Sequence, residues 1–181
     1  MTPMKSFLSL LQWMQGDGRR AALFSALGSA SVLAAAWYYE HVVKLLPCYL
    51  CYLERKPHMA LIALGLPAAL AKNPKARASL LAVMAVLALA NTGISIFHVG
   101  VEHHWWNGLS SCSAPTAVAT TLDQARNLIF GSTIVPCDKA VWFFLGISMA
   151  GWNGIISLGM ALWAGFAAWR SYQSRSSSLS Q

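Results

Sequence analysis

The sequence predicts an all-α integral membrane protein, a four-helix bundle with a short horizontal helix in its second outer loop. Three observations support this prediction. The 181 residues are 56% hydrophobic and only 10% charged, whereas a soluble domain contains about 25% charged residues. Four stretches are apolar over nearly the length that a helix needs to cross a bilayer. The Lys and Arg residues collect on one side of these stretches.

The four spans are expected at about residues 21–39, 51–71, 78–98 and 144–169, in a single membrane domain that covers residues 1–181. The second span is the weakest, because its uncharged part is short and its start contains Glu54, Arg55 and Lys56. When it is extended back to Cys51, its length is enough for a hydrocarbon core of roughly 30 Å. Pro67 can kink this helix, which a packed bundle tolerates.

The distribution of charge predicts the orientation of the chain. An even number of spans places the N-terminus, the 72–77 loop and the 170–181 tail on one side, and that side contains the whole net charge of +7. Lys and Arg mark cytoplasmic segments, so loops 40–50 and 99–143 are expected to face outward, into the periplasm of a Gram-negative cell. The positive charge is then a topology signal, and we expect no nucleic-acid partner.

The four cysteines form two pairs on this outer face. Cys48 and Cys51 form a C-x-x-C at the start of the second span, and Cys112 and Cys137 lie in the long second outer loop. Disulfides persist in the periplasm, so a structural four-span protein with two staples is one interpretation. A C-x-x-C closes a very short loop and gains little from a cross-link. This spacing more often marks redox or metal chemistry.

A metal-binding or sensory membrane protein is the rival interpretation. Four cysteines match the ligand number of a zinc site, and four histidines lie on the same face: His41, His98, His103 and His104. The second cysteine pair lacks the C-x-x-C spacing of a zinc knuckle, and His103 and His104 are adjacent rather than four residues apart. The spacing therefore favours two redox dithiols, and we expect no metal.

The long outer loop is expected to bring Cys112 and Cys137 between a soluble partner and the membrane. Within it, residues 122–130 repeat apolar side chains at helical spacing, which predicts a short helix lying on the membrane. Thiol–disulfide exchange can pass electrons from a partner dithiol through this pair to Cys48 and Cys51. Because Cys48 and Cys51 lie at the lipid boundary, a lipid-soluble two-electron acceptor such as a quinone can reoxidise them.

Arg55 stands four residues after Cys51, one helical turn further along the same face. A permanent cation there favours a thiolate and stabilises a quinone oxygen. The alternatives for Arg55 are a headgroup anchor and a salt bridge to Glu54, although adjacent residues of a helix point apart. Asn91 and Asn153 lie within or near spans, where they predict interhelical hydrogen bonds. Asn153 could instead line a cavity.

These motifs resemble those of the disulfide bond formation protein B family (DsbB). The resemblance covers about residues 20–170 and rests first on Cys48-x-x-Cys51-x-x-x-Arg55 followed by a loop pair of cysteines. Other segments agree with the family: Phe97-His98-Val99-Gly100-Val101-Glu102, Trp105-Trp106, Pro136-Cys137-Asp138, Trp142-Phe143-Phe144-Leu145-Gly146 and Gly151-Trp152-Asn153. Vitamin K epoxide reductase-like proteins also combine four helices with two cysteine pairs, but their C-x-x-C follows the loop pair. The order found here favours the DsbB family.

The resemblance implies a thiol:quinone oxidoreductase of the bacterial inner membrane, with its active cysteines facing the periplasm. Such a protein reoxidises a periplasmic thioredoxin-fold dithiol oxidase (DsbA-like), passes the electrons to ubiquinone or menaquinone, and so drives disulfide bond formation. Two segments depart from the family pattern. Asn107-Gly108-Leu109 stands where many relatives have a Gly-Pro pair, and His103-His104 is also unusual. Both are expected to affect docking of the partner or mobility of the loop rather than the redox path.

The resemblance also implies a role for each site residue. By position, Cys112 forms the mixed disulfide with the partner, and Cys137 resolves it by exchange with Cys48. Cys51 meets the quinone, with Arg55 beside it. His98 takes the place of a family histidine near the quinone site.

Overall fold

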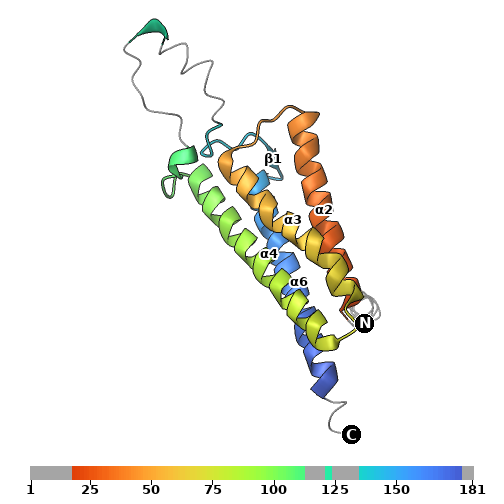
Figure 1. The fold of residues 1–181 in the computed structure, drawn as a ribbon. Helices are drawn as coiled ribbons and strands as arrows, with labels where there is room; N and C mark the ends of the chain where they lie inside the picture. The colour runs from red at the N-terminus through yellow and green to blue at the C-terminus, as the bar shows by residue number, and fades with distance from the viewer. Residues whose placement is uncertain (1–17, 113–120, 124–134, 177–181) are drawn as a thin grey trace, which may run out of the picture.

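Four long helices lie side by side in the computed structural model, which describes residues 18–112, 121–123 and 135–176 (Figure 1). Short elements join them at one end of the bundle. In chain order the elements are α2 (Arg19–His41), α3 (Tyr49–Leu70), α4 (Pro74–Glu102), the 3-10 turn η1 (Ser110–Cys112), β1 (Phe143–Phe144), β2 (Ile147–Ser148) and α6 (Met149–Ser176). The helix predicted at residues 122–130 falls largely outside the described residues, so it stays a prediction.

Two of the long helices, α3 and α4, begin at a side chain that caps them. Cys48 precedes α3, and its sulfur accepts a hydrogen bond from the backbone N–H of Cys51. Asn73 precedes α4 and accepts from the N–H of Lys75, with Pro74 in the first turn, where a missing N–H costs nothing. Along the chain, the long helices alternate in direction (Figure 1). The cysteine-bearing start of α3 lies at one end of the bundle, and the short connection from α3 to α4 lies at the other (Figure 1).

The interior of the bundle is packed with small side chains. The larger of two buried clusters consists mainly of alanines from all four helices, with Leu61, Leu81 and Met84 among them. A Cβ atom added at Gly65 of α3 would overlap Ala26 of α2 and approach the carbonyl oxygen of Ala22. Small residues at a helix interface allow this close approach, which is typical of membrane bundles.

Large apolar side chains instead point outward. Leu27, Leu66, Val86 and Leu162, one on each long helix, are between 59% and 67% exposed. Among the described helices, α2 and α4 are long and apolar enough to cross a membrane by length and composition. α3 is less apolar, because Glu54, Arg55 and Lys56 lie in its first turns. An outer surface of this kind is suited to lipid rather than water.

The last long helix begins at Met149, later than residue 144, where the final predicted span starts. Residues 143–148 form a tight antiparallel hairpin instead, pairing Phe143 with Ser148. Its two central residues, Leu145 and Gly146, have positive φ values of 52° and 78°, as a type I′ turn requires. The hairpin connects the segment that contains Cys137 to the top of α6.

Candidate functional site

The two loop cysteines form a disulfide. Cys112 and Cys137 are 25 residues apart in sequence, and their Cα atoms lie 5.1 Å from each other. Cys112 ends the η1 turn, and its carbonyl oxygen accepts a hydrogen bond from the N–H of Cys137 at 3.3 Å. Both side chains are buried. The disulfide therefore fixes the two ends of the long loop against the bundle.

The C-x-x-C cysteines are free, with their sulfur atoms 2.7 Å apart. The backbone N–H of Cys51 donates to the Cys48 sulfur at 3.2 Å, at a helix N-terminus whose partial positive charge favours an anion. The hydrogen bond from the Cys51 side chain lowers the pKa of the Cys48 thiol below its usual range, and it outweighs burial, which raises that pKa. Cys48 is therefore prepared to act as a thiolate.

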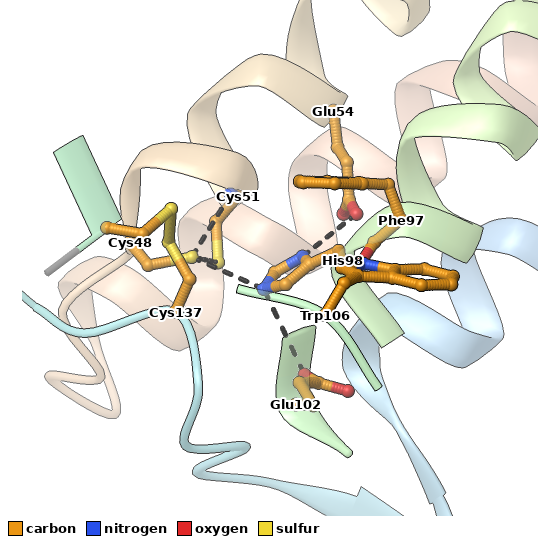
Figure 2. The surroundings of a disulfide bond; sticks show 9 residues. Cys48, Cys51, Glu54, Phe97, His98, Glu102, Trp106 and Cys137 are labelled. Atoms are coloured by element: carbon orange, nitrogen blue, oxygen red, sulfur yellow. Dashed lines mark hydrogen bonds and ion pairs between the residues drawn. A yellow bond between two sulfur atoms is a disulfide. The ribbon is translucent and has the colours of Figure 1, made fainter. Parts of the chain in front are cut away.

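The structure brings all four predicted cysteines to one place. Cys48, Cys112 and Cys137 belong to one buried cluster, and Cys51 packs against it. Figure 2 shows the disulfide beside the free pair, where α3 begins and α4 ends. Two dithiols in such contact can exchange electrons by thiolate attack on a neighbouring disulfide.

His98 faces the free cysteines from α4. Its Nε2 atom lies 3.5 Å from the sulfur of Cys48, and its Nδ1 atom lies 3.0 Å from a carboxylate oxygen of Glu54. Glu102, one turn further along α4, places an oxygen 4.0 Å from Nε2 and accepts a hydrogen bond from the hydroxyl of Ser148. The imidazole is thus oriented by carboxylates from two helices (Figure 2).

Arg55 is buried, with 8% of its surface exposed. Its guanidinium donates to a carboxylate oxygen of Glu40, near the end of α2, and lies 4.9 Å above the ring of Tyr52. The hydroxyl of Tyr52 donates to the other oxygen of Glu40 at 3.1 Å. Arg55 therefore pairs with Glu40, while Glu54 turns toward His98.

A largely apolar cavity of about 230 Å³ lies directly below the cysteines. Cys48, Cys51, Arg55 and His98 line its outer end, and α2 and α6 supply apolar walls. Such a cavity, with few polar groups at defined positions, is the usual form of a small-molecule site. The residues present fit a flat, apolar ring molecule with polar oxygens, which is the chemistry of a quinone.

Sequence reasoning missed several polar partners of this site. The motifs assign no role in the site to Glu40, Glu102 or His58, and they offer Glu54 only as a partner of Arg55. Two of them leave a sequence signal. Glu102 stands four residues after His98, and His58 stands seven residues after Cys51, both spacings that place side chains on one helical face. The pairing of Arg55 with Glu40 has no such signal.

Asn91 and Asn153 form the predicted hydrogen bonds between helices, and Asn153 has the second role considered for it as well. Asn91 and Asn153 hydrogen-bond between helices, with the ring nitrogen of His58 as a common partner. Asn153 also lines the cavity. These contacts form a buried polar layer beneath the cysteines.

A metal ion has a possible set of ligands at the same place. The donor atoms of Cys48, Cys51 and His98 all lie within 4.8 Å of one another, a soft set of the kind that binds zinc or copper(I) when the thiols are reduced. A site with four cysteine ligands would need Cys112 and Cys137 as thiolates, and here these two are joined to each other.

Comparisons with known proteins place the chain in a family. The family model described as "Disulfide bond formation protein DsbB" matches residues 18–167. Relatives named "Disulfide bond formation protein B" include one from Xanthomonas euvesicatoria, 31% identical over 86% of this chain and 93% of the relative. Another, from Xanthomonas oryzae, is 32% identical over 84% and 93%, and one from Albidiferax ferrireducens is 30% identical over 83% and 87%. No solved structure gives a significant match.

The family match agrees with the structure, which is mostly helical and has two helices able to span a membrane among the described residues. The matched residues include all four cysteines, Arg55 and His98. The chain therefore belongs to the DsbB family of membrane disulfide bond formation proteins, and as a member of that family it is a disulfide oxidoreductase.

Proposed function

We propose that this protein is a thiol:quinone oxidoreductase, which reoxidises a periplasmic DsbA-like dithiol oxidase and reduces a membrane quinone. One observation supports this activity above all others. A disulfide and a free C-x-x-C lie in one buried cluster, directly above an apolar cavity. Electrons from a soluble thiol can enter at the disulfide and leave toward a lipid-soluble acceptor.

The thiol steps balance in electrons and protons. A partner dithiol loses two electrons and two protons to the Cys112–Cys137 disulfide, through a mixed disulfide between the partner and Cys112. Cys137 then attacks Cys48 of an oxidised Cys48–Cys51 pair, and Cys51 leaves as a thiolate. Attack of Cys112 on Cys137 restores the loop disulfide and releases Cys48. The thiolate-favouring position of Cys48 makes it a good leaving group in this step.

The cavity residues have complementary tasks in the final step. A quinone supplies the two-electron acceptor, because it takes up the two electrons and two protons of the dithiol and becomes a quinol. Cys48 and Cys51 both line the cavity. The family resemblance assigns contact with the acceptor to Cys51, and Arg55 stabilises negative charge beside it. His98, in contact with Cys48 and Glu54, can hold the proton that Cys48 releases. Ubiquinone and menaquinone both have the required chemistry.

The proposed location is the bacterial inner membrane, with loops 40–50 and 99–143 and their cysteines in the periplasm. The distribution of Lys and Arg supports it, because the net charge of +7 gathers at the termini and at the 72–77 loop. The partner is then a periplasmic thioredoxin-fold protein.

The deciding experiment is quinone reduction by the purified protein in detergent, with a reduced DsbA-like protein as electron donor. We expect turnover by the natural protein and a loss of at least a hundredfold in Cys51→Ser and in Cys112→Ser, because each change interrupts the relay at a different pair. Tyr49→Phe is a suitable control, because Tyr49 lies beside Cys48 and is 46% exposed.

Two results would contradict the proposal. The first is quinone reduction that survives in either cysteine variant. The second is an absence of turnover with both quinones, together with stoichiometric zinc or copper on the reduced protein. That second result would favour the metal site formed by Cys48, Cys51 and His98.

A further inference from the structure

A buried polar network surrounds His58, which is only 1% exposed at the centre of the bundle. Its Nδ1 atom lies 3.2 Å from the hydroxyl of Ser29 on α2. Its Nε2 atom lies 2.9 Å from the amide oxygen of Asn153 on α6 and 3.1 Å from the amide nitrogen of Asn91 on α4. Asn91 also donates to Ser157, at 2.9 Å. All four long helices thus meet at one imidazole.

The network has more hydrogen-bonding capacity than its own members use. Nε2 of His58 can donate to the oxygen of Asn153 or accept from the nitrogen of Asn91, but it cannot do both in one protonation state. In addition, the amide oxygen of Asn91 has no partner among the described residues. Buried polar groups are nearly always paired, because an unpaired one is costly. The unpaired oxygen of Asn91 is an acceptor and does not line the cavity. The group that a ligand oxygen can use is therefore the N–H of His58, because its Nε2 atom has two alternative partners.

His58 lies on the same face of α3 as the redox residues. Cys51, Arg55 and His58 follow one another at i, i+4 and i+7, and all three line the cavity. Seven residues of helix correspond to about 10 Å along the axis. Asn153 also lines the cavity, whereas Asn91 and Ser157 do not. His58 and Asn153 thus face the inner end of the cavity that Cys51 faces at its outer end.

The two ends of the cavity differ in charge. Its charged lining residues are Glu54, Arg55, Glu102 and Lys139, with His98 nearby, and they belong to the end that contains the cysteines. At the inner end, the neighbours of His58 are hydroxyl and amide groups, and the surrounding walls include Val32 and Ile156. A neutral oxygen therefore matches the inner end, and an anion does not.

We propose that His58, positioned by Asn153, forms a hydrogen bond with the quinone oxygen that points away from Cys51. The inference rests on the proposed function, because it concerns the quinone in the same cavity. The two carbonyl oxygens of a quinone stand on opposite sides of its ring. When one oxygen lies beside Cys51 and Arg55, the other points inward, where the N–H of His58 can turn from the oxygen of Asn153 to the quinone oxygen. Asn153, whose amide nitrogen donates to Ser95 at 2.9 Å, then holds the imidazole in place.

The test measures quinone binding separately from turnover. Trp142 and Trp152 line the cavity, so a soluble short-chain ubiquinone analogue should quench their fluorescence on binding. We expect His58→Leu to weaken this binding about three- to tenfold, the effect of one lost hydrogen bond, and to raise the quinone KM to a similar extent. His58→Gln should recover most of the affinity. Single-turnover exchange between the partner dithiol and the Cys112–Cys137 disulfide should not change.

Ser157→Ala is the matched control, because Ser157 is a fully buried member of the same network that does not line the cavity. Its quinone affinity should match that of the natural protein. Equal loss in His58→Leu and Ser157→Ala would overturn the proposal and leave the network as helix packing. Natural affinity in His58→Leu would overturn it as well. If His58→Leu does not fold, Asn153→Ala replaces it, with the same expected weakening.

The outcomes separate this inference from the proposed function. Arg55→Ala, tested beside the His58 variants, should raise the quinone KM through loss of the cation next to Cys51. If the natural protein neither binds nor reduces the quinone, the proposed function fails. If it does both, Arg55→Ala is impaired and the His58 variants are not, only the role of His58 fails.

Discussion

Several contacts of the Cys48 sulfur act together on the pKa of its thiol. Its sulfur accepts a hydrogen bond from a helix N-terminus, contacts the sulfur of Cys51 and lies 3.5 Å from the imidazole of His98. The hydrogen bonds from Cys51 lower the pKa of the Cys48 thiol, whereas burial and the nearby Glu54 carboxylate raise it. The hydrogen bond from the Cys51 side chain is the largest of these influences, so it can be tested by itself.

Removal of that donor should raise the pKa of Cys48. In reduced protein that lacks the loop pair (Cys112→Ser with Cys137→Ser), thiolate absorbance near 240 nm should rise with pH at a midpoint below the roughly 8.5 of a free cysteine. A lowered pKa means more thiolate at neutral pH, by a factor of ten for each unit. Cys51→Ala should move the midpoint upward, whereas Cys51→Ser keeps an O–H donor and should move it less. An identical midpoint in Cys51→Ala would exclude this hydrogen bond as the cause.

The sequence identifies the candidate site residues more fully than it identifies the side chains that contact them. The four cysteines and Arg55 can be found because their spacing along the chain is itself the motif, whereas His98 follows only from the resemblance to the DsbB family. Their partners depend on how each helix is rotated against its neighbours. Arg55 could pair with Glu40 or Glu54 as far as the sequence shows, and only packing of α2 on α3 decides for Glu40.

At the scale of the helix, α3 determines the site. It begins at the C-x-x-C, presents Arg55 and His58 to the cavity, and continues through Pro57 and Pro67 without ending. Its position depends on close contact with α2 at Gly65, where an added Cβ would overlap Ala26. The packing of α3 on α2 also aligns Glu40 with Arg55.

Gly65→Ala should therefore destabilise the bundle. The added methyl group forces backbone or side chains apart, at a cost of about 1–3 kcal/mol, and thermal unfolding in detergent should occur at a lower temperature. Gly93→Ala is the control, because no atom lies within 4 Å of the Cβ position there. That change should be neutral or slightly stabilising. Equal unfolding temperatures for the two variants would contradict this account of the α2–α3 contact.

The ends of a helix can be predicted where hydropathy changes sharply along the sequence. They cannot be predicted where the geometry of a turn sets the end of the helix. Apolar runs mark α2 and α4 clearly. The start of α6 is less evident, because Trp142, Phe143 and Phe144 are apolar enough to continue a span. The positive φ values at Leu145 and Gly146 instead turn these residues into a hairpin, and aromatic residues also suit a membrane interface.

For the whole molecule, orientation is the property on which the proposed function depends most, because that function requires the cysteines to meet a periplasmic partner. Single cysteines at exposed sites can test it in a variant whose four natural cysteines are replaced by serine. Val43→Cys, at the cysteine-bearing end, should react with a membrane-impermeant maleimide in intact spheroplasts. Lys75→Cys, at the start of α4, should react only after the membrane is permeabilised.

The opposite labelling pattern would invert the orientation and place the cysteines in the cytoplasm. Labelling of both positions in intact spheroplasts would show that the two ends share one side. Neither result agrees with the concentration of Lys and Arg at the termini and the 72–77 loop.

The burial of the loop disulfide limits which thiols can react with it. Only 4% of Cys112 and 1% of Cys137 are exposed, so a small thiol that diffuses past finds almost no sulfur to attack. Under the proposed function, a partner protein must displace the residues that cover Cys112 before its thiolate reaches the bond, and a thiol of low molecular weight has no binding energy for this. In the proposed function, this burial restricts electron flow from small reductants to the quinone, so that the partner protein is the main electron donor.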